Sequence, residues 1–130
     1  MNTDANWKKG VPDWKKESKG KVRPRFVNVP MIYSSTAGAK LTIEFTGTAI
    51  GAYLLAGPET GIIRCTVDGK ETIEVDTLHR HSGFNYPMTV MFFNELADGK
   101  HTLELEILEN RSGRMKAGGT ALRVIGFTGN

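Results

Sequence analysis

The residues best suited to chemistry lie in one short segment, 77–87. Within eight positions it combines planar hydrogen-bonding groups with aromatic rings, namely His79, Arg80, His81, Phe84, Asn85 and Tyr86. Aromatic rings can stack on the apolar face of a sugar, and planar donors can bond to its hydroxyl groups. If these side chains converge, we expect a saccharide as the ligand. The alternative stays open that Phe84 and Tyr86 close the end of the fold while the charged side chains face water.

A catalytic use of the same segment has weaker support. Ser82 lies beside His79 and His81, and a serine nucleophile needs a base within hydrogen-bond reach. A serine next to a histidine on a loop is common, however, and nothing obvious in the sequence supplies an oxyanion hole. The Gly-x-Ser-x-Gly motif of many serine hydrolases is also absent. We therefore predict no catalytic residue and no enzyme activity for this chain.

Metal binding is the third chemistry to consider. His79 and His81 are two residues apart, which on an extended segment places both rings on one side. A transition metal would need a third ligand, for which Asp76 or His101 could serve. Carboxylates near turns, Asp68 and Asp76, could in principle contribute to a calcium site. None of these patterns is specific, so we predict neither a metal nor another cofactor.

Two further polar residues fall in the middle of apparent strands. Tyr53 and Arg64 would form a stacking and donor pair if their strands were neighbours, although core packing of Tyr53 explains its position equally well. The predicted ligand-binding set is therefore His79, Arg80, His81, Asn85, Tyr86, Tyr53 and Arg64.

The elements that must position these residues are short strands. Residues 40–46 and 101–107 alternate apolar and polar side chains, the period of a strand with one buried face. Asp68-Gly69 is typical of a two-residue hairpin turn, here between strands 62–67 and 72–75. His101 follows a second turn, and we expect it to hydrogen-bond loop backbone. The predicted strands, about eight in all, are 25–33, 40–46, 49–55, 62–67, 72–75, 88–93, 101–107 and 120–127.

This pattern indicates an all-β fold, an antiparallel β-sandwich or barrel, because no helix-period segment occurs after the N-terminal 24 residues. At 130 residues the chain has the usual size of one domain and can bury a single core. Its one cysteine, Cys65, cannot form an internal disulfide, so packing must supply the stability.

The first 24 residues differ in composition from the rest. Residues 1–25 hold eight Lys and Arg against three acids, which leaves nine against eleven in the remainder. A nucleic-acid module would place its charge on a folded face among stacking aromatics, so we expect no nucleic-acid partner. We predict a basic, partly ordered arm over 1–24 and a sandwich domain over 25–130. At least one of Trp7 and Trp14 should dock on that domain.

Membrane and targeting signals are not evident. No apolar stretch approaches the roughly 18 residues that a spanning helix requires, and the first ten residues contain no apolar signal-peptide core. We expect no membrane partner. These features fit an intracellular protein, or a mature or excised fragment.

The order of the strand and turn signals over residues 40–127 resembles a known family. The features are Phe-x-Gly-Thr-x-Ile-Gly at 45–51, Val-Asp-Gly-Lys at 67–70, Leu-x-Asp-Gly-Lys-His-Thr-Leu at 96–103 and a closing apolar strand at 121–127. They are similar to those of the galactose-binding-like jelly-roll accessory domain that is joined to SGNH/GDSL-type hydrolases and other bacterial carbohydrate-active enzymes. The Gly-Asp-Ser nucleophile block of those hydrolases is absent here.

The resemblance implies a jelly-roll sandwich that acts as a non-catalytic, carbohydrate-associated module. It implies weak saccharide binding, an adjoining hydrolase domain as partner, and a bacterial secreted context, extracellular or periplasmic. Because such sandwiches bind many ligands or none, a purely structural or interaction domain without a small-molecule ligand is the alternative.

Overall fold

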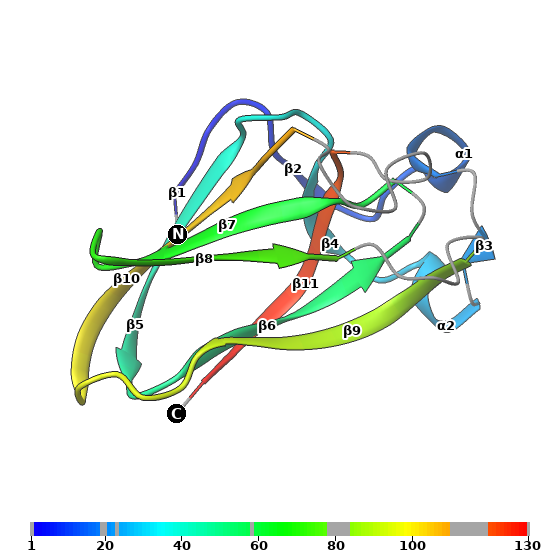
Figure 1. Cartoon of the computed structure of the whole chain (residues 1–130). Coiled ribbons are helices and arrows are strands. Elements are labelled where there is room, and N and C mark those ends of the chain that lie inside the picture. Colours follow the sequence, from blue (N-terminus) through cyan, green and yellow to red (C-terminus); the bar gives the residue numbers. More distant parts are fainter. Residues whose placement is uncertain are drawn as a thin grey trace.

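The computed structural model describes residues 2–18, 21–22, 24–57, 59–77, 84–109 and 120–129, and they form a β-sandwich (Figure 1). One sheet, sheet A, has five strands in the order β1-β5-β10-β7-β8. The other, sheet B, has six in the order β2-β4-β11-β6-β9-β3. The predicted all-β sandwich is therefore confirmed.

The elements have the following bounds. The strands are β1 (Asn2–Thr3), β2 (Lys8–Gly10), β3 (Lys21–Val22), β4 (Met31–Ser34), β5 (Lys40–Gly47), β6 (Ile50–Ala56), β7 (Ile62–Val67), β8 (Glu71–Asp76), β9 (Phe84–Phe93), β10 (Gly99–Ile107) and β11 (Leu122–Gly129). The two short helices are α1 (Trp14–Glu17) and α2 (Pro24–Val27).

Strands β4 to β11 correspond to the eight predicted from the sequence. The largest difference is at the first, which begins at Met31 instead of residue 25 because residues 24–27 form α2. Pro24 stands at the start of that helix, where its missing N–H costs no hydrogen bond. The other strands, β1, β2 and β3, come from the N-terminal segment. All strand pairs run antiparallel except β3 with β9, which is parallel.

The main core lies between the two sheets. On β10 the side chains of Leu103, Leu105 and Ile107 point inward and are almost completely buried, while the alternating residues face outward. Their partners on the other side of the core include Leu54 and Val124 of sheet B. Cys65 is buried here as well, and burial raises the pKa of its thiol to about 12, so it serves as a small apolar side chain.

The predicted Asp-Gly hairpin joins β7 to β8. Asp68 and Gly69 have φ values of 53° and 66°, and the Lys70 N–H donates to the Val67 carbonyl at 3.0 Å. Positive φ at both central residues matches the right-handed twist of the flanking strands. This hairpin prediction is confirmed.

The N-terminal segment packs against both sheets. Trp7 is 8% exposed within the main core, and its Nε1 donates to the Lys40 carbonyl at 2.8 Å. Short pairings join β1 to β5 and β2 to β4. The expectation that a tryptophan docks on the sandwich is therefore confirmed.

A second apolar cluster lies on the outer face of sheet B. Phe26, Met31, Tyr33 and Leu55 are buried there, and Trp14 packs against them. Residues of α1 and α2 thus cover part of this face (Figure 1). Neither described helix is long and apolar enough to cross a membrane.

Candidate functional site

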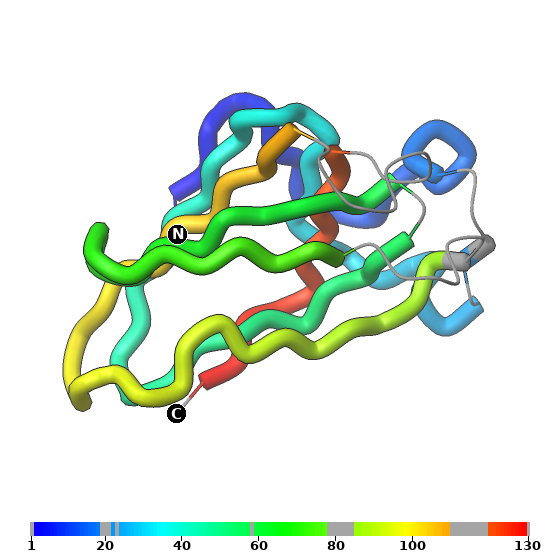
Figure 2. The backbone as a smooth tube through the Cα atoms, in the orientation of Figure 1, coloured from blue at the N-terminus to red at the C-terminus, as the bar shows by residue number. Residues whose placement is uncertain are grey.

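The segment that carried the predicted ligand-binding residues connects β8 to β9. His79, Arg80 and His81 lie outside the described residues. Both ends of the connection are described, and they lie at the end of the sandwich opposite the β7–β8 turn (Figure 2). At its start, Thr77 donates through its backbone N–H and its Oγ1 to the Gly61 carbonyl, at 3.0 Å and 2.6 Å. The connection therefore leaves the sandwich from a fixed point.

At the other end of the connection, Asn85 is fully buried. Its Oδ1 accepts from Arg123 Nη1 at 2.7 Å, and its Nδ2 donates to Ser18 Oγ at 2.8 Å. Gly57 faces the same amide, and a Cβ at that position would overlap Asn85 Oδ1. Asn85 was predicted to contact a ligand, but the structure places its side chain in the protein interior with no exposed surface. It positions the start of β9 instead.

The centre of this buried region is Arg123 on β11, whose exposed fraction is 2%. Its Nη2 donates to the Glu17 carbonyl and to Glu59 Oε1, both at 3.0 Å. Its guanidinium lies 5.2 Å from the centre of the Trp14 ring. Burial lowers the pKa of the guanidinium, and Glu59 opposes this shift. An arginine keeps its charge in such surroundings, so Arg123 is a buried cation surrounded by oxygen acceptors and one aromatic face.

These residues form what we name the Arg123 cluster: Arg123, Asn85, Glu59, Ser18 and Trp14. Ser18 completes it by donating to Glu59 Oε1 at 2.7 Å. The cluster connects β11, β9, the β6–β7 turn and the α1 region. Sequence reasoning missed it, since the only signal was one arginine in an otherwise apolar strand, and its partners are far apart in the sequence.

Tyr53 and Arg64 do not form the predicted pair. Tyr53 is on β6 of sheet B, where it packs half-buried against the second apolar cluster. Arg64 is on β7 of sheet A, between Glu74 at 3.5 Å and Glu106 at 3.4 Å. The two strands belong to different sheets, so the two side chains are not neighbours.

Tyr86, the remaining predicted residue, lies near the start of β9 opposite Ala56 of β6. It is half-buried. Tyr86 therefore follows Asn85 at the base of the connection, and part of its surface is accessible to solvent.

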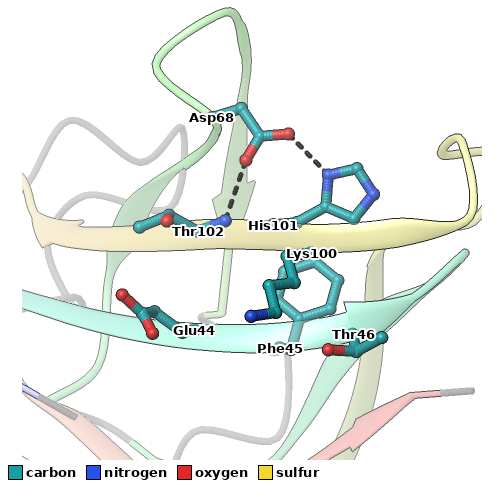
Figure 3. A pocket seen from close by; sticks show the side chains of 7 residues that line it. All are labelled: Glu44, Phe45, Thr46, Asp68, Lys100, His101 and Thr102. Atoms are coloured by element: carbon teal, nitrogen blue, oxygen red, sulfur yellow. Dashed lines mark hydrogen bonds and ion pairs between the residues drawn. The ribbon is translucent and has the colours of Figure 1, made fainter.

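A second polar site lies at the other end of sheet A, and we name it the His101 hollow (Figure 3). Its volume is about 380 Å³. Strands β5 and β10 and the β7–β8 turn supply its lining residues, which are Glu44, Phe45, Thr46, Asp68, Lys100, His101 and Thr102.

A clamp between His101 and Asp68 holds one wall of the hollow. His101 Nδ1 is 2.5 Å from Asp68 Oδ2, and Nε2 is 2.5 Å from the Ala97 carbonyl oxygen. Asp68 Oδ1 also accepts from the Thr102 N–H at 2.8 Å. Both ring nitrogens face oxygen atoms, an arrangement in which the doubly protonated imidazolium can donate to both. The pKa of His101 is correspondingly raised by Asp68, and the pKa of Asp68 is lowered by His101.

The predicted backbone hydrogen bond of His101 is present, but the sequence did not reveal its bond to Asp68. The two residues are 33 positions apart. Both nitrogens of the ring are occupied, so His101 has no free basic nitrogen with which to activate a nucleophile.

Two histidines of this chain follow an aspartate at the spacing found in SGNH hydrolases. Their late Asp-x-x-His spacing occurs here at Asp76–His79 and at Asp98–His101. His79 is outside the described residues, and both ring nitrogens of His101 are hydrogen-bonded within the clamp. Among the residues that the structure describes, no group of three His, Cys, Asp or Glu side chains could hold a metal ion.

Comparison with solved structures finds this fold within larger proteins. One is a family two carbohydrate esterase from Clostridium thermocellum in complex with cellohexaose, at 19% identity over 77% of this chain with a TM-score of 0.55. Another is a two-domain esterase active on acetylated mannans, co-crystallized with mannopentaose, at 12% identity over 97% of this chain with a TM-score of 0.62.

This chain spans 27% and 34% of the lengths of those two proteins. At such low identities the likeness establishes the fold and nothing further about activity. No protein-family model matches the chain. None of the curated proteins matches it either.

Proposed function

We propose that this chain is a non-catalytic, carbohydrate-associated β-sandwich module that accompanies a glycan-active or ester-cleaving SGNH-type hydrolase and binds saccharide weakly. The observation that carries the proposal is the likeness of 97% of the chain to about a third of a two-domain esterase active on acetylated mannans. A third of such a protein is the share that one of two unequal domains would occupy.

The saccharide contact is proposed for the β8–β9 connection. His79, Arg80 and His81 offer planar donors and Tyr86 offers a ring, which together suit the hydroxyl groups and the apolar face of a sugar. Thr77 and Asn85 fix the two ends of the connection. Fixed ends reduce the conformational entropy that binding must overcome. Because the contact would consist of ring stacking and a few hydrogen bonds, we expect weak binding.

The experiment is a calorimetric titration with cellohexaose and with mannopentaose, the sugars found with the two similar esterases. We expect weak binding that is lost in Arg80→Ala and in Tyr86→Ala. Lys70→Ala is the matched control, since Lys70 is exposed in the β7–β8 turn at the opposite end of the sandwich. Thermal melts establish that each variant is folded.

Binding of neither sugar, nor of any other polysaccharide in a broad panel, would contradict the saccharide role. That result would favour the alternative, a structural or interaction domain without a small-molecule ligand. The observation that favours this alternative is the burial of Asn85 within the Arg123 cluster, which gives part of the predicted site a purely internal role.

The partner and the location are also proposals. We propose an adjoining hydrolase domain and an extracellular or periplasmic location. The reading frame that encodes the chain tests both, since it should contain, or directly neighbour, a Gly-Asp-Ser hydrolase segment and a secretion signal. A frame that encodes only unrelated domains would contradict the association.

The non-catalytic role has its own test. The clamp occupies both ring nitrogens of His101, and Ser82 with His79 or His81 is the remaining nucleophile and base combination. We expect no turnover of p-nitrophenyl acetate above the buffer rate. Turnover that disappears in Ser82→Ala would overturn the assignment.

A further inference from the structure

The His101 hollow has the features of a built site and lies far from the β8–β9 connection. The β7–β8 turn that forms its wall is at one end of sheet A, and the end of β8 is at the other (Figure 1). A single sugar residue in the hollow would therefore not touch the proposed loop site. The hollow is a separate place where this domain could contact a ligand.

The floor of the hollow is a square of polar side chains on two neighbouring strands. Glu44 and Thr46 of β5 are exposed, and so are Lys100 and Thr102 of β10. Thr46 is paired with Lys100, and Glu44 with Thr102. Neighbouring strands are about 5 Å apart, so the carboxylate, the ammonium group and the two hydroxyls are close enough for one small ligand to reach several of them.

The wall of the hollow is held by hydrogen bonds. Asp68 accepts from both His101 and the Thr102 N–H, and its own backbone has a positive φ of 53° within the turn (Figure 3). The His101 ring also lies 5.4 Å from the Phe45 ring, centre to centre. Side chains already held in place lose little conformational entropy when a ligand binds.

The charges that line the hollow indicate which class of ligand it can bind. Asp68 and a protonated His101 neutralise each other within the clamp. Among the described residues Glu44 and Lys100 have no ion-pair partner, and their charges also cancel. An anionic ligand in this site would be repelled by Glu44, and a cationic ligand would be repelled by Lys100. A neutral ligand with several hydroxyls can instead donate to Glu44 and accept from Lys100.

We infer that the His101 hollow is a second saccharide-contact site, which takes a neutral, hydroxyl-bearing sugar residue through Glu44, Lys100, Thr46 and Thr102. This inference rests on the proposed carbohydrate role and adds to it a site at the opposite end of the domain. With two contact points, one glycan chain or two neighbouring chains could engage both ends of the sandwich.

The first test is a titration of the isotope-labelled intact chain with cellohexaose, and separately with mannopentaose, followed by amide NMR shifts. We expect shifts for Glu44, Thr46 and Thr102 and for the neighbouring β7–β8 turn. Shifts confined to residues 77–87 would overturn the hollow while leaving the proposed function intact. No shift anywhere with either sugar would contradict both.

The second test uses substitutions on the exposed floor. Glu44→Gln and Lys100→Met each remove a hydrogen bond to a charged group, and we expect about tenfold weaker binding for the hollow. Glu104→Gln is the matched control, because Glu104 follows Thr102 by two residues on β10 and does not line the hollow. We expect it to bind as the unmodified chain does.

Unchanged affinity in both Glu44→Gln and Lys100→Met would overturn the inference. Tighter binding of an oligogalacturonate than of the neutral sugars would also overturn it, because the charge argument would then be wrong. Circular dichroism establishes that the variants keep the sandwich, which we expect since both side chains are exposed.

Discussion

Among single residues, Arg123 and Arg64 show how burial changes the contribution of an ion pair to the stability of the fold. Arg123 is 2% exposed and bonds to Glu59, Asn85 and the Glu17 carbonyl. The Arg64 side chain is 39% exposed and approaches Glu74 and Glu106 at longer distances. Water screens the second arginine and is largely excluded from the first.

Arg123→Met should therefore lower the free energy of unfolding by about 3 kcal/mol, because it leaves Asn85 and the Glu17 carbonyl without their buried donor. Urea denaturation of the two variants measures the difference. The matched control, Arg64→Met, should cost less than about 1 kcal/mol. Equal losses for the two would contradict the structural role of the Arg123 cluster.

The His101 clamp predicts a pH dependence of stability. Asp68 and the Ala97 carbonyl raise the pKa of His101, and Asp98 adds to this effect. A raised pKa means that the clamp stabilises the fold fully below the unfolded value of about 6.5 and loses this contribution as the pH rises through the folded value. The pKa of Asp68 is lowered, so its contribution is lost in acid, as the pH falls through that lowered value.

Thermal melts of the unmodified chain and of His101→Gln, from about pH 5 to about pH 9, measure this contribution. The difference between their melting temperatures should be largest in mildly acidic buffer and should shrink as the pH rises. A difference that stays constant across this range would show that the clamp is not charged.

At the scale of elements, the N-terminal segment contributes β1 and β2 to the two sheets and α1 to the cover of sheet B. Its two tryptophans have unequal roles. Trp7 is buried between the sheets and donates to the Lys40 carbonyl, whereas Trp14 is half-buried against Arg123 and donates to the Val27 carbonyl at 3.2 Å. Trp7 thus fills part of the main core, whereas Trp14 adds a contact at the surface.

We expect Trp7→Ala to cost about 3 kcal/mol or more, the usual loss for a large aromatic residue in a core. Trp14→Ala should cost about 1 kcal/mol, the order of a cation–π contact that is partly solvated. The free energies of unfolding in urea measure both. A larger loss for Trp14 would mean that the second apolar cluster, and not the main core, determines the docking of this segment.

At the scale of the whole molecule, one core connects both sheets and the N-terminal segment. The main core includes Trp7 together with residues of β5, β6, β7, β10 and β11. Both tryptophans lie in the first 14 residues, so their fluorescence reports the N-terminal segment while circular dichroism reports the strands.

We therefore expect the fluorescence and circular dichroism transitions in urea to coincide, as they do in a two-state protein. A fluorescence transition at lower urea concentration would indicate that the N-terminal segment detaches before the sandwich unfolds. Trp7→Phe is a useful companion variant, because its remaining fluorescence comes from Trp14 alone.

Local sequence patterns were enough to establish the fold class. The alternation over 40–46 and 101–107 fixes which side chains face the core, since a strand places successive residues on opposite faces. Asp68-Gly69 determined the β7–β8 hairpin, because few residue pairs tolerate two positive φ values. These are local properties, and they suffice for the strands and for their order along the chain.

The contacts between residues far apart in the chain became known from the three-dimensional structure. It placed Tyr53 and Arg64 in different sheets, enclosed Asn85 with Arg123, and brought Asp68 to His101. Each of these depends on strand order and register, which join residues tens of positions apart. The physical reason is that long-range pairing is set by the packing of the whole core, whereas periodicity and turn chemistry are set by the nearest neighbours in the chain.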